Sequence, residues 1–225
     1  MTPQLIRRLV VATFVTALTA TALLVTPAVT TIGIPTASAA CPAVEVIFAR
    51  GRFEPAGPGQ IGNTFVNALR KKSGKNVNLY AVRYPADNQV DLGANDMNAR
   101  VQSTMASCPD TRIVLGGYSL GAAVTDVALA VPFAFFGFDN PLPPGADQHI
   151  AAVTLFGNGS VWAGPIGAIS PLYRERTIDL CHGADPICNP ADPNTWEQNW
   201  TDHAARAYID AGMVNEAADF AAARV

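Results

Sequence analysis

The chain has 225 residues, of which 49% are hydrophobic and only 15% are charged. This composition excludes an intrinsically disordered protein, because a chain this apolar can bury enough surface to fold. The 18 acidic and 15 basic side chains give a formal net charge of −3, which offers no basic surface to a nucleic acid. We therefore expect a single compact domain that has no nucleic-acid partner.

The N-terminal segment has the pattern of an export signal. Two adjacent arginines are followed by an apolar, uncharged run over residues 9–25, and the Ala-Ser-Ala sequence at residues 37–39 fits a cleavage site. The pattern predicts a signal peptide over residues 1–39 and a mature domain over residues 40–225. We thus expect a secreted protein, released outside the cell or kept at the envelope. A retained membrane anchor is the alternative, because the apolar run approaches the length of a single span.

The four cysteines all lie in the predicted mature domain. An even number of cysteines in an exported protein indicates disulfides, and three connectivities are possible. The short separation favours Cys181 with Cys188, which leaves Cys41 with Cys108. A zinc site is the competing interpretation, but no Cys-x-x-Cys spacing occurs and the histidines are not paired with the thiols. We therefore expect two disulfides and no metal.

Short β-rich segments alternate with longer helical patterns along the chain. Strands are predicted over residues 44–49, 77–82, 112–116, 150–156 and 176–180. Helices are predicted over residues 61–72, 88–107, 120–131, 203–210 and 213–223. Residues 133–144 and 185–199 carry no such period. Strands separated by helices form a sheet covered on both faces. The pattern thus predicts a three-layer α/β/α sandwich with a mostly parallel central sheet.

The sequence Gly-Tyr-Ser-Leu-Gly at residues 117–121 contains the candidate catalytic nucleophile. It follows a predicted strand and opens a predicted helix, which is the context that a nucleophile elbow requires. In such an elbow the turn is so sharp that glycines must flank it, and the serine hydroxyl projects from the carboxyl edge of the sheet. Ser119 is therefore the candidate nucleophile.

A serine nucleophile needs a histidine base and an orienting carboxylate, which follow it in the order acid, then histidine. His149 lies at the start of a predicted strand, and His182 precedes the best acid candidate. His203 alone follows every acid candidate, at the start of a predicted terminal helix. We assign it as the base, the alternative being a solvated or capping histidine.

Asp185 is the best candidate for the carboxylate. It follows a predicted strand and lies within the ring that the second predicted disulfide closes, which would fix its orientation. Asp179 is the main rival, and Asp202 is set aside because it adjoins His203. With Pro186 after it, Asp185 also fits a simple turn.

Several motifs together resemble cutinases. They are Cys41 before a predicted strand, the Ala49-Arg50-Gly51 loop, the Gly-Tyr-Ser-x-Gly elbow, the ring from Cys181 through Asp185-Pro186 to Cys188, and the late His203. The resemblance covers residues 41–225 and is most specific for the secreted cutinase-like esterases of actinobacteria, especially mycobacteria.

This resemblance implies an α/β-hydrolase fold and a secreted carboxylic ester hydrolase that acts on lipid or small esters through an acyl-enzyme. It implies Ser119, Asp185 and His203 as the triad, in agreement with the assignment above. It also implies a disulfide between Cys41 and Cys108. Acyl transfer of this kind needs no metal or organic cofactor. We expect a monomer with transient contact to a lipid interface.

The resemblance further implies an oxyanion hole formed by the backbone N–H groups of Leu120 and Arg52. Cutinases usually have Ser or Thr where this chain has Arg52, and commonly Gln where it has Leu120. Both N–H groups remain, but the supporting hydroxyl is missing. A catalytically weak or inactive binding protein on a hydrolase scaffold is therefore the alternative function, against which stands the intact order of the triad.

Two further segments allow more than one interpretation. Residues 133–138 contain four phenylalanines, which form either buried core or a contact for acyl chains and lipid. Residues 57–62 (Gly-Pro-Gly-Gln-Ile-Gly) match a dinucleotide fingerprint. The first glycine does not end the preceding strand, however, and no acidic residue ends the second strand, so we do not expect nicotinamide binding.

We expect Arg52→Thr to raise the turnover of a short acyl ester. The new hydroxyl supplies an oxyanion donor, and one such donor is worth on the order of 100-fold in rate. The measurement is kcat of the folded variant with p-nitrophenyl acetate. Equal or lower turnover in a variant with unchanged folding contradicts the role given to position 52.

Overall fold

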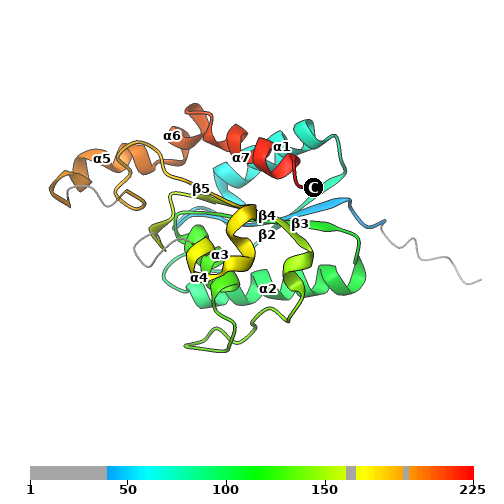
Figure 1. The fold of residues 1–225 in the computed structure, drawn as a ribbon. Coiled ribbons are helices and arrows are strands. Elements are labelled where there is room, and N and C mark those ends of the chain that lie inside the picture. The colour runs from blue at the N-terminus through cyan, green and yellow to red at the C-terminus, as the bar shows by residue number, and fades with distance from the viewer. Residues whose placement is uncertain (1–39, 161–165, 190–192) are drawn as a thin grey trace, which may run out of the picture. The chain divides into compact units, whose positions relative to one another are not determined.

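The computed structural model describes residues 40–160, 166–189 and 193–225, and Figure 1 shows how their helices and strands are arranged. The predicted export signal lies outside the described residues. Within these three ranges, no helix is both long and apolar enough to cross a membrane.

Among the described residues, five parallel strands form a sheet in the order β2-β1-β3-β4-β5. They are β1 (Val44–Ala49), β2 (Val77–Ala81), β3 (Arg112–Tyr118), β4 (Ile150–Phe156) and β5 (Thr177–Leu180). Every residue of β1 and β4 is buried, as expected for strands covered on both faces. The predicted parallel sheet is therefore confirmed.

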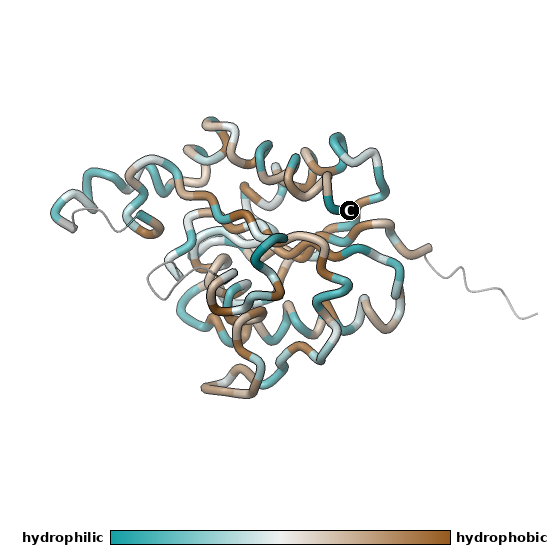
Figure 2. The backbone as a smooth tube through the Cα atoms, in the orientation of Figure 1, coloured by the Kyte–Doolittle hydropathy of each residue, from teal (hydrophilic) through white to brown (hydrophobic). Residues whose placement is uncertain are grey.

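Helices cover both faces of this sheet. One face carries α2 (Val90–Ser107), α3 (Leu120–Ala130) and α4 (Ile166–Ile169), and the other carries α1 (Gly59–Ser73), α6 (Ala205–Asp210) and α7 (Met213–Ala222) (Figure 1). Short 3₁₀ helices lie at Ala146–Gln148, Pro171–Arg176 and Pro193–Thr195. Alternate residues of β1 enter separate cores, Ile47 on the α2 side and Phe48 on the α1 side. In Figure 2 the apolar colour follows the central strands. The structure is the predicted three-layer sandwich.

The predicted helix over residues 203–210 is wrong at its start. Helix α5 (Trp196–His203) ends at His203, and extended backbone at Ala204 separates it from α6. Within α5 only His203 is buried, so the helix has no apolar period for the sequence to reveal. His203 therefore lies at the C-terminus of a helix instead of beginning one.

The cysteines pair as their spacing predicted. Cys41 is bonded to Cys108, which joins the segment before β1 to the end of α2, and Cys181 is bonded to Cys188 just after β5. In the chain-entropy model, the first bridge, with its separation of 67 residues, contributes about 3–5 kcal/mol to stability. The second closes a small ring at the carboxyl edge of the sheet.

The carboxyl end of β3 is where α3 comes closest to the sheet. β3 extends two residues beyond its predicted end, because Gly117 still pairs with Ala49 of β1. A Cβ atom on Gly121 would lie 2.0 Å from the Ala49 carbonyl oxygen, and one on Gly117 would lie 2.0 Å from the Gly121 carbonyl oxygen. Only glycine at these two positions lets α3 begin directly against β1.

We expect Gly121→Ala to lower the free energy of unfolding by about 3 kcal/mol or to prevent folding, because the added methyl meets backbone atoms. The urea midpoint of unfolding is the measurement. Ala123→Gly, two positions along α3, is the control and changes helix propensity alone, for about 1 kcal/mol. Equal losses in the two variants contradict the close approach.

Candidate active site

Ser119 occupies the sharp turn between β3 and α3. Its backbone angles, φ 55° and ψ −119°, lie where non-glycine residues are rare, so the surrounding structure must hold it there. The Ser119 N–H donates to the Phe156 carbonyl of β4 (2.8 Å), and the Ser119 carbonyl accepts from the Ala122 N–H (2.9 Å). These bonds fix the backbone at the residue and set the direction of its hydroxyl.

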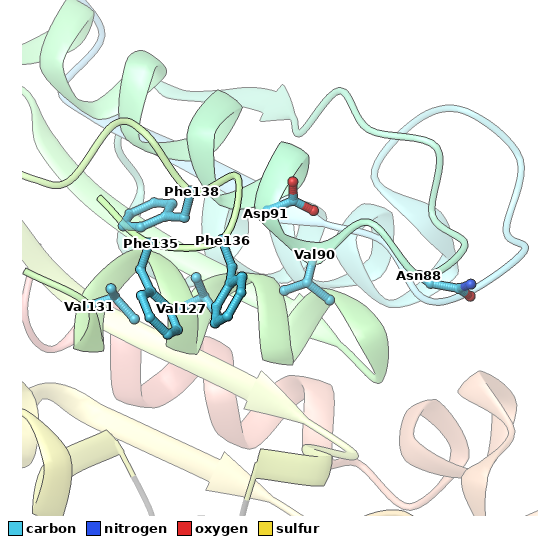
Figure 3. A pocket seen from close by; sticks show the side chains of 8 residues that line it. All are labelled: Asn88, Val90, Asp91, Val127, Val131, Phe135, Phe136 and Phe138. Carbon is cyan, nitrogen blue, oxygen red and sulfur yellow. The ribbon is translucent and has the colours of Figure 1, made fainter. Parts of the chain in front are cut away.

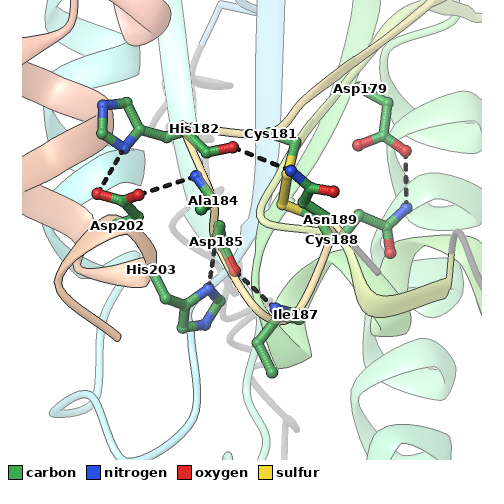
Figure 4. The surroundings of a disulfide bond; sticks show 12 residues. Asp179, Cys181, His182, Ala184, Asp185, Ile187, Cys188, Asn189, Asp202 and His203 are labelled. Carbon is green, nitrogen blue, oxygen red and sulfur yellow. Dashed lines mark hydrogen bonds and ion pairs between the residues drawn. A yellow bond between two sulfur atoms is a disulfide. The ribbon is translucent and has the colours of Figure 1, made fainter. Parts of the chain in front are cut away.

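The structure brings Ser119, His203 and Asp185 together from three separate segments. His203 Nε2 lies 2.8 Å from Ser119 Oγ, and His203 Nδ1 lies 2.7 Å from Asp185 Oδ2. Asp185 lies inside the disulfide ring and His203 ends α5, and Figure 4 shows the two side chains meeting there. Asp185 is fully buried and His203 is 9% exposed, so their hydrogen bond is shielded from bulk water.

The Asp185 carboxylate accepts hydrogen bonds from two groups besides His203. Its Oδ1 accepts from the Ile187 N–H (2.7 Å), and its Oδ2 also accepts from the Tyr208 hydroxyl. Burial by itself would raise the pKa of Asp185, but hydrogen bonds from His203, Tyr208 and Ile187 outweigh it and hold this pKa below its usual value. The carboxyl group is therefore ionised at neutral pH although it is buried.

Two tyrosines at the site were not assigned from the sequence. The Tyr118 hydroxyl donates to the backbone carbonyl of His203, and its ring stacks on the imidazole with 5.3 Å between centroids. The Tyr208 hydroxyl donates to Asp185, and burial raises its pKa. The Trp200 ring also packs edge to face with the imidazole of His203, with 5.4 Å between centroids. Tyr118 could have been assigned to the site from the sequence, because it directly precedes Ser119 in the elbow. Nothing in the sequence of α6 distinguishes Tyr208 from a core residue.

The rival histidine and aspartates have other partners. His182 Nδ1 lies 3.7 Å from one oxygen of Asp202, whose other oxygen accepts from the Ala184 N–H (2.8 Å). Asp179 accepts from the side-chain amide of Asn158 (2.9 Å). Figure 4 shows His182 and Asp202 beside the disulfide ring, with Asp179 apart from His203.

The half-buried Asp179 also shares its amide partner with the buried Asp126. The Asn158 amide donates to Asp126 as well (2.8 Å), and burial raises the pKa of both carboxyl groups, that of Asp126 to about 6. A carboxylate that orients a histidine must be ionised when the base works. The low pKa of Asp185 suits this task better than the raised pKa of Asp179.

The Gly-rich segment over residues 57–62 is arranged around an acidic side chain. The Glu54 carboxylate accepts from the N–H groups of Gly51 (2.7 Å) and Gln60 (3.0 Å). Gln60 lies in the first turn of α1, so Glu54 occupies the place at the helix N-terminus that a pyrophosphate would need. This arrangement argues against a dinucleotide site here.

The two expected oxyanion residues lie on the segments that meet at the elbow. Leu120 is the first residue of α3, so its N–H has no acceptor within the helix. Arg52 follows β1; its guanidinium donates to Asn88 Oδ1 (2.6 Å) and lies 4.9 Å from the centre of the Phe53 ring. The Arg52 side chain is thus engaged along the loop, and the roles of the two backbone N–H groups stay a prediction.

Comparison with known proteins identifies relatives over the length of the chain. A model of the Cutinase family matches residues 40–225. The chain is 62% identical to the Probable carboxylesterase Culp2 of Mycobacterium tuberculosis (strain ATCC 25618 / H37Rv), with 100% of both chains covered. It is 46% identical to the Phospholipase Culp4 of the same strain, over 93% of this chain and 88% of that protein.

Two solved structures are also similar. One is a Trichoderma reesei cutinase in complex with a C11Y4 phosphonate inhibitor, with 29% identity, a TM-score of 0.60, and 82% of this chain and 75% of that chain covered. The other is the catalytic core domain of acetyl xylan esterase from Trichoderma reesei, with 26% identity, a TM-score of 0.64, and 82% and 100% covered.

The fold and these relatives define the class of protein, a carboxylic ester hydrolase with an α/β-hydrolase fold. The chain belongs to the cutinase family. The fold class, the family and the ester-hydrolase activity expected from the sequence are therefore confirmed.

Proposed function

We propose that Ser119, His203 and Asp185 are the catalytic triad of this ester hydrolase. One observation carries the proposal: an unbroken line of hydrogen bonds runs from Ser119 Oγ through both ring nitrogens of His203 to Asp185 Oδ2. A serine hydroxyl becomes a competent nucleophile when a neighbouring base accepts its proton during attack.

The reaction proceeds in two steps. In the first, Ser119 Oγ bonds to the ester carbonyl carbon while His203 Nε2 takes the hydroxyl proton. The tetrahedral intermediate then breaks its bond to the alcohol oxygen, which leaves with the proton from His203. In the second, a water molecule gives a proton to His203 and attacks the acyl-enzyme. The acid is released and Ser119 regains its proton.

Asp185 sets the tautomer of the base. It accepts from the Nδ1–H of His203, which leaves Nε2 free to accept the proton of Ser119. Because Asp185 is ionised, it also stabilises the imidazolium that forms in both steps. Tyr118 and Tyr208 are positioning residues, one for the backbone of His203 and one for the carboxylate.

The backbone N–H groups of Leu120 and Arg52 form the oxyanion hole in this proposal. The first N–H groups of α3 point toward the developing negative charge, and the helix dipole favours an anion there. The tight contact of Gly121 with β1 supports a fixed geometry between the two segments. Without a hydroxyl at position 52, we expect a slower enzyme than cutinases that have one.

The substrates in this proposal are esters of lipids or of small alcohols, and the enzyme works outside the cytoplasm as a monomer. Relatives named as carboxylesterase and phospholipase support the substrate class. The two disulfides and the signal pattern over residues 1–39 support export, because such bridges persist in oxidising surroundings.

Fluorophosphonate labelling of residues 40–225, with both disulfides oxidised, tests the triad, because this probe reacts with activated serines. The label should map to Ser119 and be lost in Ser119→Ala and His203→Ala. Hydrolysis of p-nitrophenyl esters over a range of acyl lengths should fall by roughly 10⁴-fold or more in both variants.

Two matched controls remove the rival groups. Asp179→Asn and His182→Ala should keep the label and most of the hydrolysis, whereas Asp185→Asn should lose most of it. A folded protein that takes no label would reject the triad and favour an inactive binding protein on a hydrolase scaffold.

We expect Tyr208→Phe to move the acid limb of kcat/KM to higher pH, by roughly half a unit or more. The Tyr208 hydroxyl helps to hold the pKa of Asp185 low, so its loss makes the carboxylate more basic. A more basic carboxylate stabilises the protonated imidazole, which is inactive. As the pH falls, activity is therefore lost earlier than in the wild type.

Tyr118→Phe is the control for this pH profile. It removes a hydroxyl that bonds to the His203 backbone and leaves the carboxylate with its donors. The variant should lose rate or stability without a shift of the acid limb. If the profile of Tyr208→Phe also keeps the wild-type limb, Tyr208 has no electrostatic role.

A further inference from the structure

The segment after α3 forms an aromatic hairpin, residues 133–138, with the sequence Phe-Ala-Phe-Phe-Gly-Phe. Phe138 is buried, but Phe133, Phe135 and Phe136 are 59%, 56% and 87% exposed. The sequence allowed these phenylalanines to be either buried core or a lipid contact. Of the four, Phe138 alone belongs to the core. Three neighbouring exposed phenylalanines are costly in water, which calls for a reason for their placement.

The backbone conformation of the hairpin is also unfavourable for an aromatic residue at position 136. Phe135 and Phe138 exchange both backbone hydrogen bonds (2.8 and 2.9 Å), so Phe136 and Gly137 form a two-residue turn. Both have positive φ, 43° and 85°, as in a type I′ turn, whose first position favours Asn, Asp or Gly. A bulky aromatic residue at that position is strained. Backbone strain and exposure thus coincide at Phe136, a combination typical of functional positions.

A side chain of α2 holds the hairpin in place. Asn95 donates to the Gly137 carbonyl (2.7 Å) and accepts from the N–H groups of Asp139 (2.8 Å) and Asn140 (3.0 Å). The rings also contact one another edge to face, Phe133 with Phe135 and Phe135 with Phe136. The exposed rings are therefore presented by an ordered turn.

An apolar groove runs beside the hairpin. Figure 3 shows Phe135 and Phe136 beside Val127 of α3 and Val131, the residue that follows α3. The groove that these residues line has a volume of about 290 Å³. Asn88 lies at its edge and accepts a hydrogen bond from Arg52, the residue assigned to the oxyanion hole. The edge of the groove is thus in contact with the loop that carries Arg52.

We propose that the aromatic hairpin inserts into the hydrocarbon of a lipid layer and anchors the enzyme there. A segment that enters hydrocarbon must pair its backbone polar groups within the protein. Both backbone groups of Phe135 and Phe138 are paired with each other, and the Gly137 carbonyl accepts from Asn95. The hairpin has no polar side chain with which to select a protein partner. These features favour a fluid apolar medium over a protein surface.

The charge around the hairpin specifies the lipid. Asp91 lines the groove, Asp139 follows the hairpin, and one cation, Arg52, is bonded to Asn88 at the groove's edge. The whole chain carries a formal net charge of −3. Acidic groups at the contact repel anionic headgroups. The layer is therefore one of uncharged or zwitterionic lipid, held by apolar contact.

The test is sedimentation of residues 40–225 with phosphatidylcholine vesicles, in a Ser119→Ala background so that no lipid is hydrolysed. Phe136→Asn is the informative variant, because it removes the ring and installs the Asn-Gly pair that a type I′ turn prefers. The fold should be kept, with an unchanged or higher Tm. Binding to the vesicles should fall by about tenfold or more, the worth of burying one phenylalanine side chain.

Leu172→Ser is the matched control, since it removes another exposed apolar side chain, outside the hairpin. It should leave vesicle binding unchanged. An equal loss in Leu172→Ser, unchanged binding in Phe136→Asn, or no vesicle binding by the parent protein each overturns the proposal. So does binding that grows when anionic phosphatidylglycerol is added, because charge would then drive it.

Activity on soluble and on aggregated esters distinguishes a loss of anchoring from a loss of catalysis. With Ser119 restored, Phe136→Asn should hydrolyse soluble p-nitrophenyl acetate at the wild-type rate and lose activity on vesicle or emulsion substrates alone. Equal losses on soluble and aggregated esters would contradict the anchoring role. Failure of the triad proposal would leave the sedimentation result unaffected.

Discussion

The buried carboxylate of Asp185 is the constraint on which the rest of the site depends. An ion placed out of contact with water is costly unless donors surround it. Here the donors are His203, Tyr208 and the Ile187 N–H, which come from α5, α6 and the disulfide ring. Satisfying one charge therefore fixes three segments relative to each other, and with them the imidazole that faces Ser119.

The fold could be predicted where burial is uniform. The strands over residues 44–49 and 150–156 match β1 and β4 to the residue, because strands covered on both faces are uninterrupted apolar runs. Helix α5 could not be predicted, since one buried histidine among exposed residues leaves no period. Its assignment depends on contacts with the site and not on its own composition.

Some residues of the candidate site could likewise be assigned from the sequence, and others could not. That Ser119, Asp185 and His203 lie together could be predicted, because their chain order and local context match the pattern of a triad. Tyr208 could not, because its hydrogen bond depends on how α6 packs beside the disulfide ring. The aromatic hairpin shows the same limit, since six residues without a period cannot separate buried Phe138 from its exposed neighbours.

The bridge between Cys181 and Cys188 means that the site is completed by an oxidation step that follows synthesis of the chain. Its sulfurs are joined only after the chain has met an oxidant, and until then the loop that carries Asp185 lacks its covalent closure. Synthesis of the polypeptide and competence of the enzyme are thereby separate events. A chain that is still reduced has its serine and histidine in sequence but not yet the framework that aligns them.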